Sequence, residues 1–393
     1  MNAGAQQADT TRGGTRRRGP LSGLRVIELG GIGPGALGCM ILADLGAEVV
    51  RVDRPGAAGG GFLPPRADLL NRGKRSIVLD LKRREGVEAV LALARDAQVL
   101  VEGYRPGVAE RLGLGPREVW EANRKLVYGR VTGWGQDGPL AQRAGHDIGY
   151  IAITGALHAI GEAGGPPQIP LSLVGDFCGG AAYLVMGILS ALLDAQRTGR
   201  GQVVDAAIVD GTNHLLIAVR ALMACGRWVD ERGVNLFDGG CPFYSVYETA
   251  DGRYLAVGAL EPPFYAELLR ILDLDEDPER QYDRDHWPVL RERFRKVFRS
   301  RTRDEWAAVF ERTDACVAPV LSLREAESHP QMAARGNLIE VDGVVQPAPA
   351  PRFSEYPTVI PTPPVDSGHH TREILAAIGM EELLDNGVAV QSG

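Results

Sequence analysis

The pattern that most constrains the fold lies near the start of the chain, where strand-like and helix-like runs alternate. Residues 24–29 (LRVIEL) are typical of a buried strand, residues 33–46 of a glycine-opened helix, and residues 47–53 (AEVVRVD) of a second strand. The alternation continues as far as residue 131 (LVYGRV). Strands that alternate with helices predict a mostly parallel sheet covered on both faces, and therefore an α/β fold.

The later part of the chain has a different pattern. A long apolar helix is expected from about 179 to 196, where the apolar run indicates a buried helix rather than a membrane span. Residues 243–259 predict a β-hairpin that turns at Asp251 and Gly252, and a charged helical region follows to about residue 312. A proline-rich extended segment is then expected over 346–364, with a short last helix after it.

These patterns divide the chain into three parts. Residues 1–19 are small, polar and basic, which predicts a disordered tail. A large domain is expected over 20–225 together with 330–393, and a smaller α+β domain over 240–325, with linkers between them.

Composition excludes several classes of function. A net charge of −7 argues against a protein whose whole surface binds nucleic acid. The five cysteines are odd in number and form no ligand-spaced pairs, so we expect neither a disulfide framework nor a metal site. We therefore expect the protein in a reducing compartment, the cytoplasm. We expect no membrane partner.

A glycine-rich turn follows the first strand. The run from Gly33 to Gly38 satisfies the GxGxxG pattern, and Asp53 lies at the end of the next strand, as in a dinucleotide-binding unit. An NAD(P)-dependent dehydrogenase is therefore one hypothesis. Two features weaken it: proline stands within the tight turn, and Asp53 is flanked by Arg51 and Arg54, which suit phosphate better than a ribose diol. The alternative is a tight strand-to-helix turn that simply needs glycine.

Basic residues are concentrated between Arg51 and Arg84. This stretch holds nine Arg or Lys and three Asp, within a chain of negative net charge. Arg105 and Arg111 follow a later strand, at an edge that a parallel sheet would bring nearby. The group favours a small ligand with several phosphates, and the alternative is a solvated, charged loop.

Three residues are candidates for acid–base chemistry. His146 stands in a Gly-His-Asp turn and Asp176 in a Gly-Asp turn, each directly before an apolar helix-like run. Such a pair suits the transfer of a proton from one face of a carbon to the other. The alternatives are a structural histidine and a helix N-cap aspartate. Glu261 precedes a proline-opened helix, and its alternative role is a first-turn charge.

Several runs in one order resemble the α-methylacyl-CoA racemases, within the family III CoA-transferases (the CaiB/BaiF superfamily). They include PLSGLRVIELGGIGPGALGCMILADLGAEVVRVDRPG, EGYRPGVAERLGLGP, TGWGQDGP, AGHDIGY, LVGDFCGG, GQVVDAAIVDG and DGGCPFYSVYETADGRYLAVGALEPPFY, and they span about residues 20 to 272. The resemblance implies an interlocked homodimer. Each subunit would have a Rossmann-like large domain that binds CoA and a small domain reached by long linkers, with the active site between the large domain of one subunit and the small domain of the other.

The resemblance also implies roles for particular residues. His146 and Asp176 would be the acid–base pair, supported by Glu261 of the partner subunit. The residues implied as CoA contacts are Ile32, Arg54, Leu79, Lys82, Arg111, Gly145, His146, Asp147 and Tyr150. One departure is Ser172, which stands where the family commonly has an asparagine that is a candidate partner of the aspartate.

The activity implied is interconversion of (2R)- and (2S)-2-methylacyl-CoA thioesters, a step of lipid metabolism, by two-base proton transfer through an enolate. CoA would be part of the substrate, and no cofactor or metal is expected. One alternative is a family III CoA-transferase in which Asp176 is the nucleophile. A CoA-binding module without turnover is another.

Overall fold

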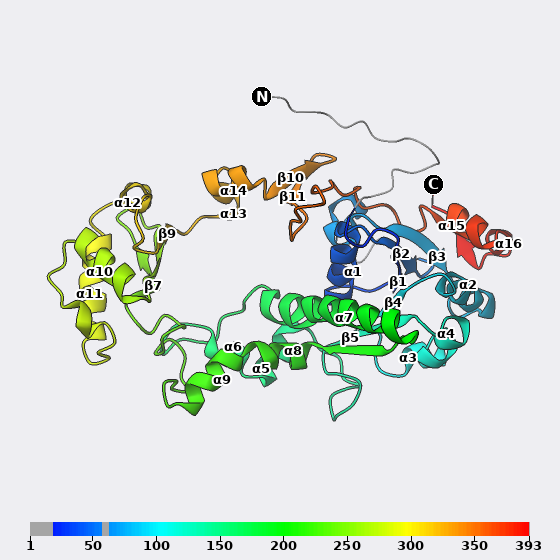
Figure 1. Ribbon diagram of the computed structural model, residues 1–393, viewed down its shortest axis with the longest axis horizontal. Coiled ribbons are helices and arrows are strands. Elements are labelled where there is room, and N and C mark those ends of the chain that lie inside the picture. Colours follow the sequence, from blue (N-terminus) through cyan, green and yellow to red (C-terminus); the bar gives the residue numbers. More distant parts are fainter. Residues whose placement is uncertain (1–18, 57–62, 393) are drawn as a thin grey trace. The chain divides into compact units, whose positions relative to one another are not determined.

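The apolar runs in the first half of the chain form the core strands of a seven-stranded sheet (Figure 1). The computed structural model describes residues 19–56 and 63–392, so nearly all of the expected disordered tail lies outside the described residues. The strand order is β12-β3-β2-β1-β4-β5-β6, and only the pairing of β12 with β3 is antiparallel. The strands are Arg25–Leu29 (β1), Glu48–Asp53 (β2), Arg75–Leu79 (β3), Val99–Glu102 (β4), Val127–Thr132 (β5), Val203–Ala207 (β6) and Ala389–Val390 (β12).

Side chains that alternate along these strands enter two separate apolar cores. On β1, Ile27 and Leu29 belong to one core, whereas Val26 belongs to the other. Helices α2 (Arg84–Ala94), α4 (Pro116–Ala122), α15 (Thr371–Ile378) and α16 (Glu382–Asp385) contribute to the first core, and α1 (Pro34–Asp44) and α7 (Tyr183–Thr198) to the second. The sheet is therefore covered on both faces, and the expected α/β class is confirmed.

The long apolar helix begins earlier than the sequence suggested. A π-helix over Leu173–Ala182 leads directly into α7. Together they form one 26-residue helix that is long and apolar enough, by length and composition alone, to cross a membrane. Leu184 and Ile188 are fully buried on the sheet, as expected for a core helix of an α/β protein.

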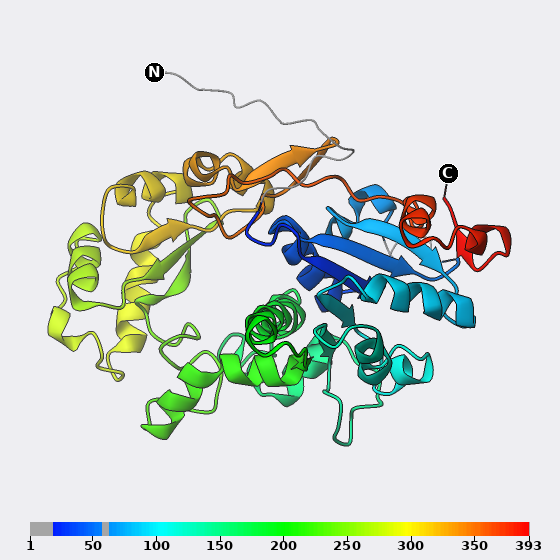
Figure 2. The ribbon, with the colours of Figure 1, turned by 45° about the vertical axis from the view of Figure 1, so that its right-hand side comes forward.

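The chain divides into two compact units. The first unit comprises Met1–Tyr150, Ser172–Thr212 and Gly336–Gly393, and the second comprises Ile151–Leu171 and Asn213–Arg335. The C-terminal segment thus returns to the first unit, where both views place α15 and α16 (red) beside the N-terminal strands (Figures 1 and 2). The first unit also contains a hairpin, β10 (Leu338–Val341) with β11 (Val344–Pro347), and the short helix α3 (Val108–Arg111).

The second unit contains the expected hairpin, β7 (Tyr244–Glu248) with β8 (Tyr254–Gly258), and a third antiparallel strand, β9 (Val317–Pro319). The remaining helices are α5 (Asp147–Ile153), α6 (Ala156–Ala159), α8 (Ile208–Leu215), α9 (Ile217–Ala224), α10 (Pro262–Ile271), α11 (Trp287–Phe298), α12 (Arg303–Phe310), α13 (Leu323–Glu327) and α14 (Pro330–Arg335), and of these α5 and α8 begin in the first unit. Aromatic side chains from β7, α11 and α12 pack together, with Tyr247 stacked on Phe298 and Trp306 stacked on Phe310. This apolar cluster gives the second unit its own core.

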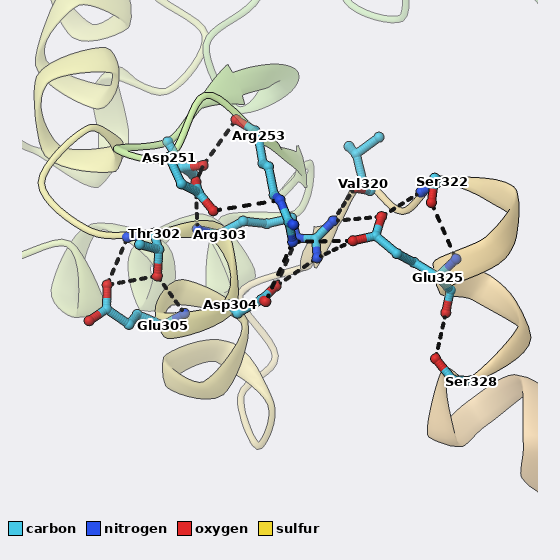
Figure 3. A network of polar contacts seen from close by, with 11 residues as sticks. Asp251, Arg253, Thr302, Arg303, Asp304, Glu305, Val320, Ser322, Glu325 and Ser328 are labelled. Atoms are coloured by element: carbon cyan, nitrogen blue, oxygen red, sulfur yellow. Dashed lines mark hydrogen bonds and ion pairs between the residues drawn. The ribbon is translucent and has the colours of Figure 1, made fainter.

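A polar network joins the hairpin turn, the start of α12 and the start of α13 in the second unit (Figure 3). Arg303, whose side chain is 5% exposed, donates to both carboxylate oxygens of Glu325 at 2.9 and 3.1 Å. Arg253 contacts the same carboxylate at 3.2 Å. Thr302 and Ser322 begin α12 and α13 with capping boxes, which fix the two helix starts that the network connects.

The boundaries of the two compact units differ from the domain boundaries expected from the sequence. Residues 151–171, 213–225 and 330–335 were expected in the large domain but pack within the second unit. One reason is Arg232, whose guanidinium donates to the carbonyl oxygens of His158 at 2.8 Å and of Gly165 at 2.6 Å. These long-range bonds connect the 151–171 segment to the loop after α9.

Candidate active site

A cavity of about 310 Å³ lies at the carboxyl ends of β1, β4 and β5, within the first unit. Its walls comprise residues 28–36, 101–104 and 131–133 together with Gly145, His146, Tyr150, Asp176 and Ile208. β1 lies between β2 and β4. The parallel strands that follow β1 in the chain are therefore added first on one side of it (β2, β3) and then on the other (β4, β5, β6). In open α/β sheets, ligands bind where the strand order reverses in this way.

The glycine-rich turn forms one wall of the cavity. Gly33 has a φ of 67° and directly precedes Pro34, the first residue of α1. This left-handed conformation favours glycine. A Cβ at Gly33 would lie only 3.5 Å from Oδ2 of Asp176, so the turn contacts the candidate acid.

His146 is placed by the start of α5. Its carbonyl oxygen accepts the amide hydrogens of Gly149 at 2.8 Å and Tyr150 at 3.3 Å, and its side chain is exposed and lines the cavity. The Gly-His-Asp turn therefore presents the imidazole at the beginning of a helix, as the sequence suggested.

Asp176 lies in the first turn of the π-helix and lines the same cavity. Its backbone amide donates to Oδ1 of Asp147 at 2.7 Å. Burial, and next the negative charge of Asp147, raise the pKa of Asp176 to about 6, while His146 acts in the opposite direction. The structure thus brings His146 and Asp176 to one cavity and gives the carboxyl group a proton affinity suited to acid–base chemistry near neutral pH.

Ser172, the departure from the family pattern, directly precedes the π-helix. It has a φ of 59°, and its carbonyl oxygen accepts the amide hydrogen of Phe177 at 3.2 Å. The Ser172 side chain makes no capping hydrogen bond to this helix. The backbone amide of Asp176 donates instead to the carboxylate of Asp147. The effect of a serine at position 172 on Asp176 stays a prediction.

Two buried carboxylates that the sequence analysis did not single out also line the cavity. Glu102, at the end of β4, accepts the amide hydrogen of Tyr104 at 2.7 Å and lies 3.3 Å from Arg130; burial raises its pKa to about 7. Glu28, on β1, forms a fully buried ion pair with Lys74 at 2.7 Å, and burial raises its pKa. The available signal was a single acidic residue near the end of each apolar strand, RVIEL and VLVEG.

The residues expected to contact CoA fall into two groups. Ile32, Gly145 and Tyr150 line the cavity together with His146. Asp147 is buried, so its side chain offers little surface to a ligand.

The other expected contacts lie outside the cavity walls. Arg54, Lys82 and Arg111 follow β2, β3 and β4 in the chain. The Leu79 side chain is fully buried in the core, so a CoA contact in this segment would come from the exposed residues after it.

Most of the basic cluster is engaged in ion pairs. Lys74 and Arg72 are buried and pair with Glu28 and Asp44, and the other paired members are Arg51, Arg66, Arg75, Arg83 and Arg84. Within residues 19–56 and 63–392, the cations of this region that form no ion pair are Arg54, Lys82, Arg105 and Arg111. Of the basic residues that were expected to bind phosphate, only these four are therefore left without a carboxylate partner among the described residues.

The contacts of Asp53 argue against the dinucleotide-binding hypothesis. Its Oδ2 accepts a hydrogen bond from Arg51 at 2.8 Å and another from the Ser76 hydroxyl at 2.7 Å. Its Oδ2 is therefore engaged by Arg51 of its own strand and by Ser76 of the neighbouring strand β3, rather than offered to a ribose diol.

Glu261 belongs to the second unit, directly before α10. Its carbonyl oxygen accepts the amide hydrogen of Tyr265 at 3.0 Å. Its support of His146 stays a prediction. Metal binding was not expected, and within the described ranges no group of three or more His, Cys, Asp or Glu residues is placed to hold a metal ion.

A doubly wound sheet with a cavity at its switch point is typical of α/β proteins that bind a ligand at the carboxyl ends of the strands, and here His146 and Asp176 line that cavity. The model of the CoA-transferase family III matches residues 21–371, and the chain belongs to this family.

Within the family, the chain is similar to enzymes named α-methylacyl-CoA racemase, which confirms the resemblance found in the sequence. It is 45% identical to the one from Mus musculus, covering 93% of this chain and 95% of that protein. It is 44% identical to the one from Homo sapiens, covering 91% and 93%. A crystal structure of a CaiB/BaiF family protein from Brucella suis superposes with a TM-score of 0.77 at 28% identity, covering 92% of this chain and all of that one.

Proposed function

We propose that the protein is a racemase that interconverts (2R)- and (2S)-2-methylacyl-CoA thioesters. The observation that carries the proposal is the shared cavity, which is lined both by His146, directly before α5, and by Asp176, in the π-helix. Relatives named α-methylacyl-CoA racemase, similar over most of their length, support it.

The reaction needs one base and one acid on opposite faces of the α-carbon. In one direction, neutral His146 removes the α-proton while protonated Asp176 delivers a proton to the other face; in the reverse direction the roles exchange. The C–H electron pair passes into the thioester as an enolate and returns to form the new C–H bond, so atoms and electrons balance. A pKa of about 6 at Asp176 keeps both of its protonation states accessible near neutral pH.

The enolate oxygen needs hydrogen-bond donors. The amide of Asp176 is occupied, because it donates to Asp147. The donors that we propose are therefore the amides of the turn from Gly145 to Asp147, at the start of α5.

CoA would reach the cavity with its phosphates beside the unpaired cations. Arg54, Arg105 and Arg111 follow β2 and β4, whose carboxyl ends lie on this side of the sheet. Guanidinium groups without a protein carboxylate are suited to bind a pyrophosphate and a 3′-phosphate.

We also propose that the protein acts as a homodimer in the cytoplasm. Exposed apolar side chains support a subunit contact, including Ile169, Leu171, Leu173, Met186, Leu193 and Ile217. In such a dimer, Glu261 of one subunit would support His146 of the other. Five free cysteines fit a reducing compartment.

The test is exchange of the α-hydrogen with deuterated water, together with loss of chirality, starting from one pure 2-methylacyl-CoA epimer. Wild type should incorporate deuterium and give both epimers. His146→Ala and Asp176→Ala should each lower the rate by roughly 10²–10⁴-fold. Exchange at the wild-type rate in either variant contradicts the proposal.

A CoA-transferase activity is the second candidate, because the family carries that description and Asp176 lies in the cavity. Asp176 would attack the thioester carbonyl and release CoA as a thiolate, giving an acyl-aspartyl anhydride. The histidine beside it favours racemisation, since a transferase needs no second base at the α-carbon. Transfer of CoA to a free carboxylic acid, without α-hydrogen exchange, would favour the transferase.

A further inference from the structure

The carboxylate of Asp147 connects the segments that carry the two candidate proton carriers, His146 and Asp176. It directly follows His146 in the chain, and its Oδ1 accepts the backbone amide hydrogen of Asp176 at 2.7 Å. Asp147 is 5% exposed, and its Oδ2 has no hydrogen-bond partner within the part of the chain that the structure describes. A buried polar atom without a partner is rare in proteins and calls for an explanation.

We propose that Asp147 is a positioning residue: Oδ1 fixes the first turn of the π-helix that carries Asp176, and the buried negative charge acts on the Asp176 carboxyl group. The inference rests on the proposed racemase function and deepens it, because it assigns the residue that prepares one of the two proton carriers.

The hydrogen bond provides the positional part. The N-cap residue of the π-helix, Ser172, makes no side-chain capping hydrogen bond and has a left-handed backbone. The bond to Asp147 joins this helix to the start of α5, which carries His146. One side chain thus links the two elements from which the acid and the base project.

The charge provides the electrostatic part. Asp147 forms no ion pair among the described residues, so its charge acts on Asp176 at short range in a partly buried site. Burial and this charge together raise the pKa of Asp176, against the effect of His146. The other titratable groups on the walls of the cavity are Tyr150 on α5, Glu28 on β1, Glu102 on β4 and Tyr104 after it.

The consequence concerns the pair as a unit. Catalysis in either direction needs one proton on the pair, held by Asp176 in one direction and by His146 in the other, so the pH profile is bell-shaped with two pKa values that belong to the pair. Without the charge of Asp147, the carboxyl group loses its proton more readily. The acid limb then moves to lower pH, and both directions of the reaction change equally because the substrate epimers fix the equilibrium.

Two substitutions separate the two parts. Asp147→Asn keeps an oxygen acceptor for the amide and removes the charge, whereas Asp147→Ala removes both. We expect the acid limb of kcat/KM to move down by about one pH unit in both variants. At the optimum, kcat should fall by roughly 100-fold further in Asp147→Ala, because Asp176 loses its support. KM should stay within about twofold of wild type if the buried side chain does not contact CoA.

The matched control is Asp137→Asn, which removes an exposed carboxylate from the loop between β5 and α5, outside the cavity walls. Its pH profile should equal that of wild type. A profile that moves in the control as much as in Asp147→Asn overturns the inference, as does an unmoved acid limb in Asp147→Asn or a change in KM alone.

A second measurement does not depend on turnover. Titration of ¹³C-labelled aspartate carboxyl groups by NMR, with the Asp176 signal assigned through Asp176→Asn, gives the pKa of Asp176 directly. A lower value in Asp147→Asn supports the inference, and an unchanged value overturns it while leaving the racemase intact. If wild type exchanges no α-hydrogen but the titration still shows the coupling, the proposed function fails instead.

Discussion

The ring of Tyr150 packs edge to face against Trp134, with the two ring centroids 4.7 Å apart. Two glycines make room for this pair. A Cβ at Gly133 would lie 2.0 Å from the Tyr150 ring, and one at Gly145 would lie 2.6 Å from the same ring. Both glycines line the cavity, so the shape of the site depends on the absence of their side chains.

Gly133→Ala should therefore destabilise the protein by about 1–3 kcal/mol and distort the cavity, because the added methyl group overlaps a ring that its neighbours hold in place. Thermal unfolding and α-hydrogen exchange measure the two effects. Gly149→Ala is the control for stability, since its Cβ would lie 3.9 Å from Trp134, an ordinary contact. Adding Tyr150→Ala to Gly133→Ala should restore the melting temperature, and no loss in the single variant would contradict the steric argument.

Asp176 should make stability depend on pH. Its pKa is raised from 3.8 to about 6 in the folded protein, so the folded state holds the proton more tightly than the unfolded state. Stability should then fall as pH rises from about 4 through about 6, and stay level above that. Asp176→Asn should raise the free energy of unfolding at neutral pH by about 1 kcal/mol after allowance for solvent screening. If the melting temperatures of wild type and of Asp176→Asn change in parallel from pH 4 to pH 8 (about four units), the result contradicts this prediction.

Much of the fold was predictable because local patterns decide it. The runs RVIEL and VLVEG are apolar for the length of a buried strand, and the glycine turn before Pro34 marks a helix start. The two-residue strand β12 and its antiparallel pairing with β3 were missed, because a contact between Ala389 and Leu79 leaves no local signal. The start of the π-helix was also missed, since its register depends on Asp147 rather than on a capping side chain of its own.

The site was predictable only in part. His146 and Asp176 stand in glycine-framed turns that the sequence displays, and the cavity contains both. The positions of Glu28 and Glu102 in the cavity wall, and their raised pKa values, depend on burial at neighbouring strand ends, which only the folded sheet creates. The positive cluster was overestimated because seven of its members find carboxylate partners, several of them distant in sequence, such as Asp44 for Arg72.

The unpaired cations should determine affinity for the CoA part of the substrate. Arg54→Ala and Arg111→Ala should each raise KM by about 10-fold with little change in kcat, because charge-assisted bonds to phosphate are lost. The dependence of KM on salt should weaken as well. Arg84→Ala is the control, because Arg84 pairs with Glu88 at 2.7 Å on the exposed face of α2. Equal effects in all three variants would argue against a specific phosphate site.

Glu325 should make the second unit sensitive to acid. Hydrogen bonds from Arg303, and then from Ser322, lower the pKa of Glu325 to about 2. A lowered pKa means that the stabilisation is fully present above the ordinary value of 4.5 and is lost as pH falls toward about 2. The melting temperature of wild type should therefore fall more steeply between about pH 5 and about pH 3 than that of Glu325→Gln. Glu340→Gln, at an exposed position on β10, should follow wild type, and identical slopes for all three would contradict the assignment.

The pairing of β12 with β3 has a consequence for biosynthesis. A ribosome completes β3 early but must translate the entire second unit before β12 emerges, so a nascent chain carries an open β3 edge throughout that interval. Unpaired strand edges are sites of intermolecular association during folding. Helper proteins that shield such edges are therefore expected to affect the yield of this protein more than its final stability.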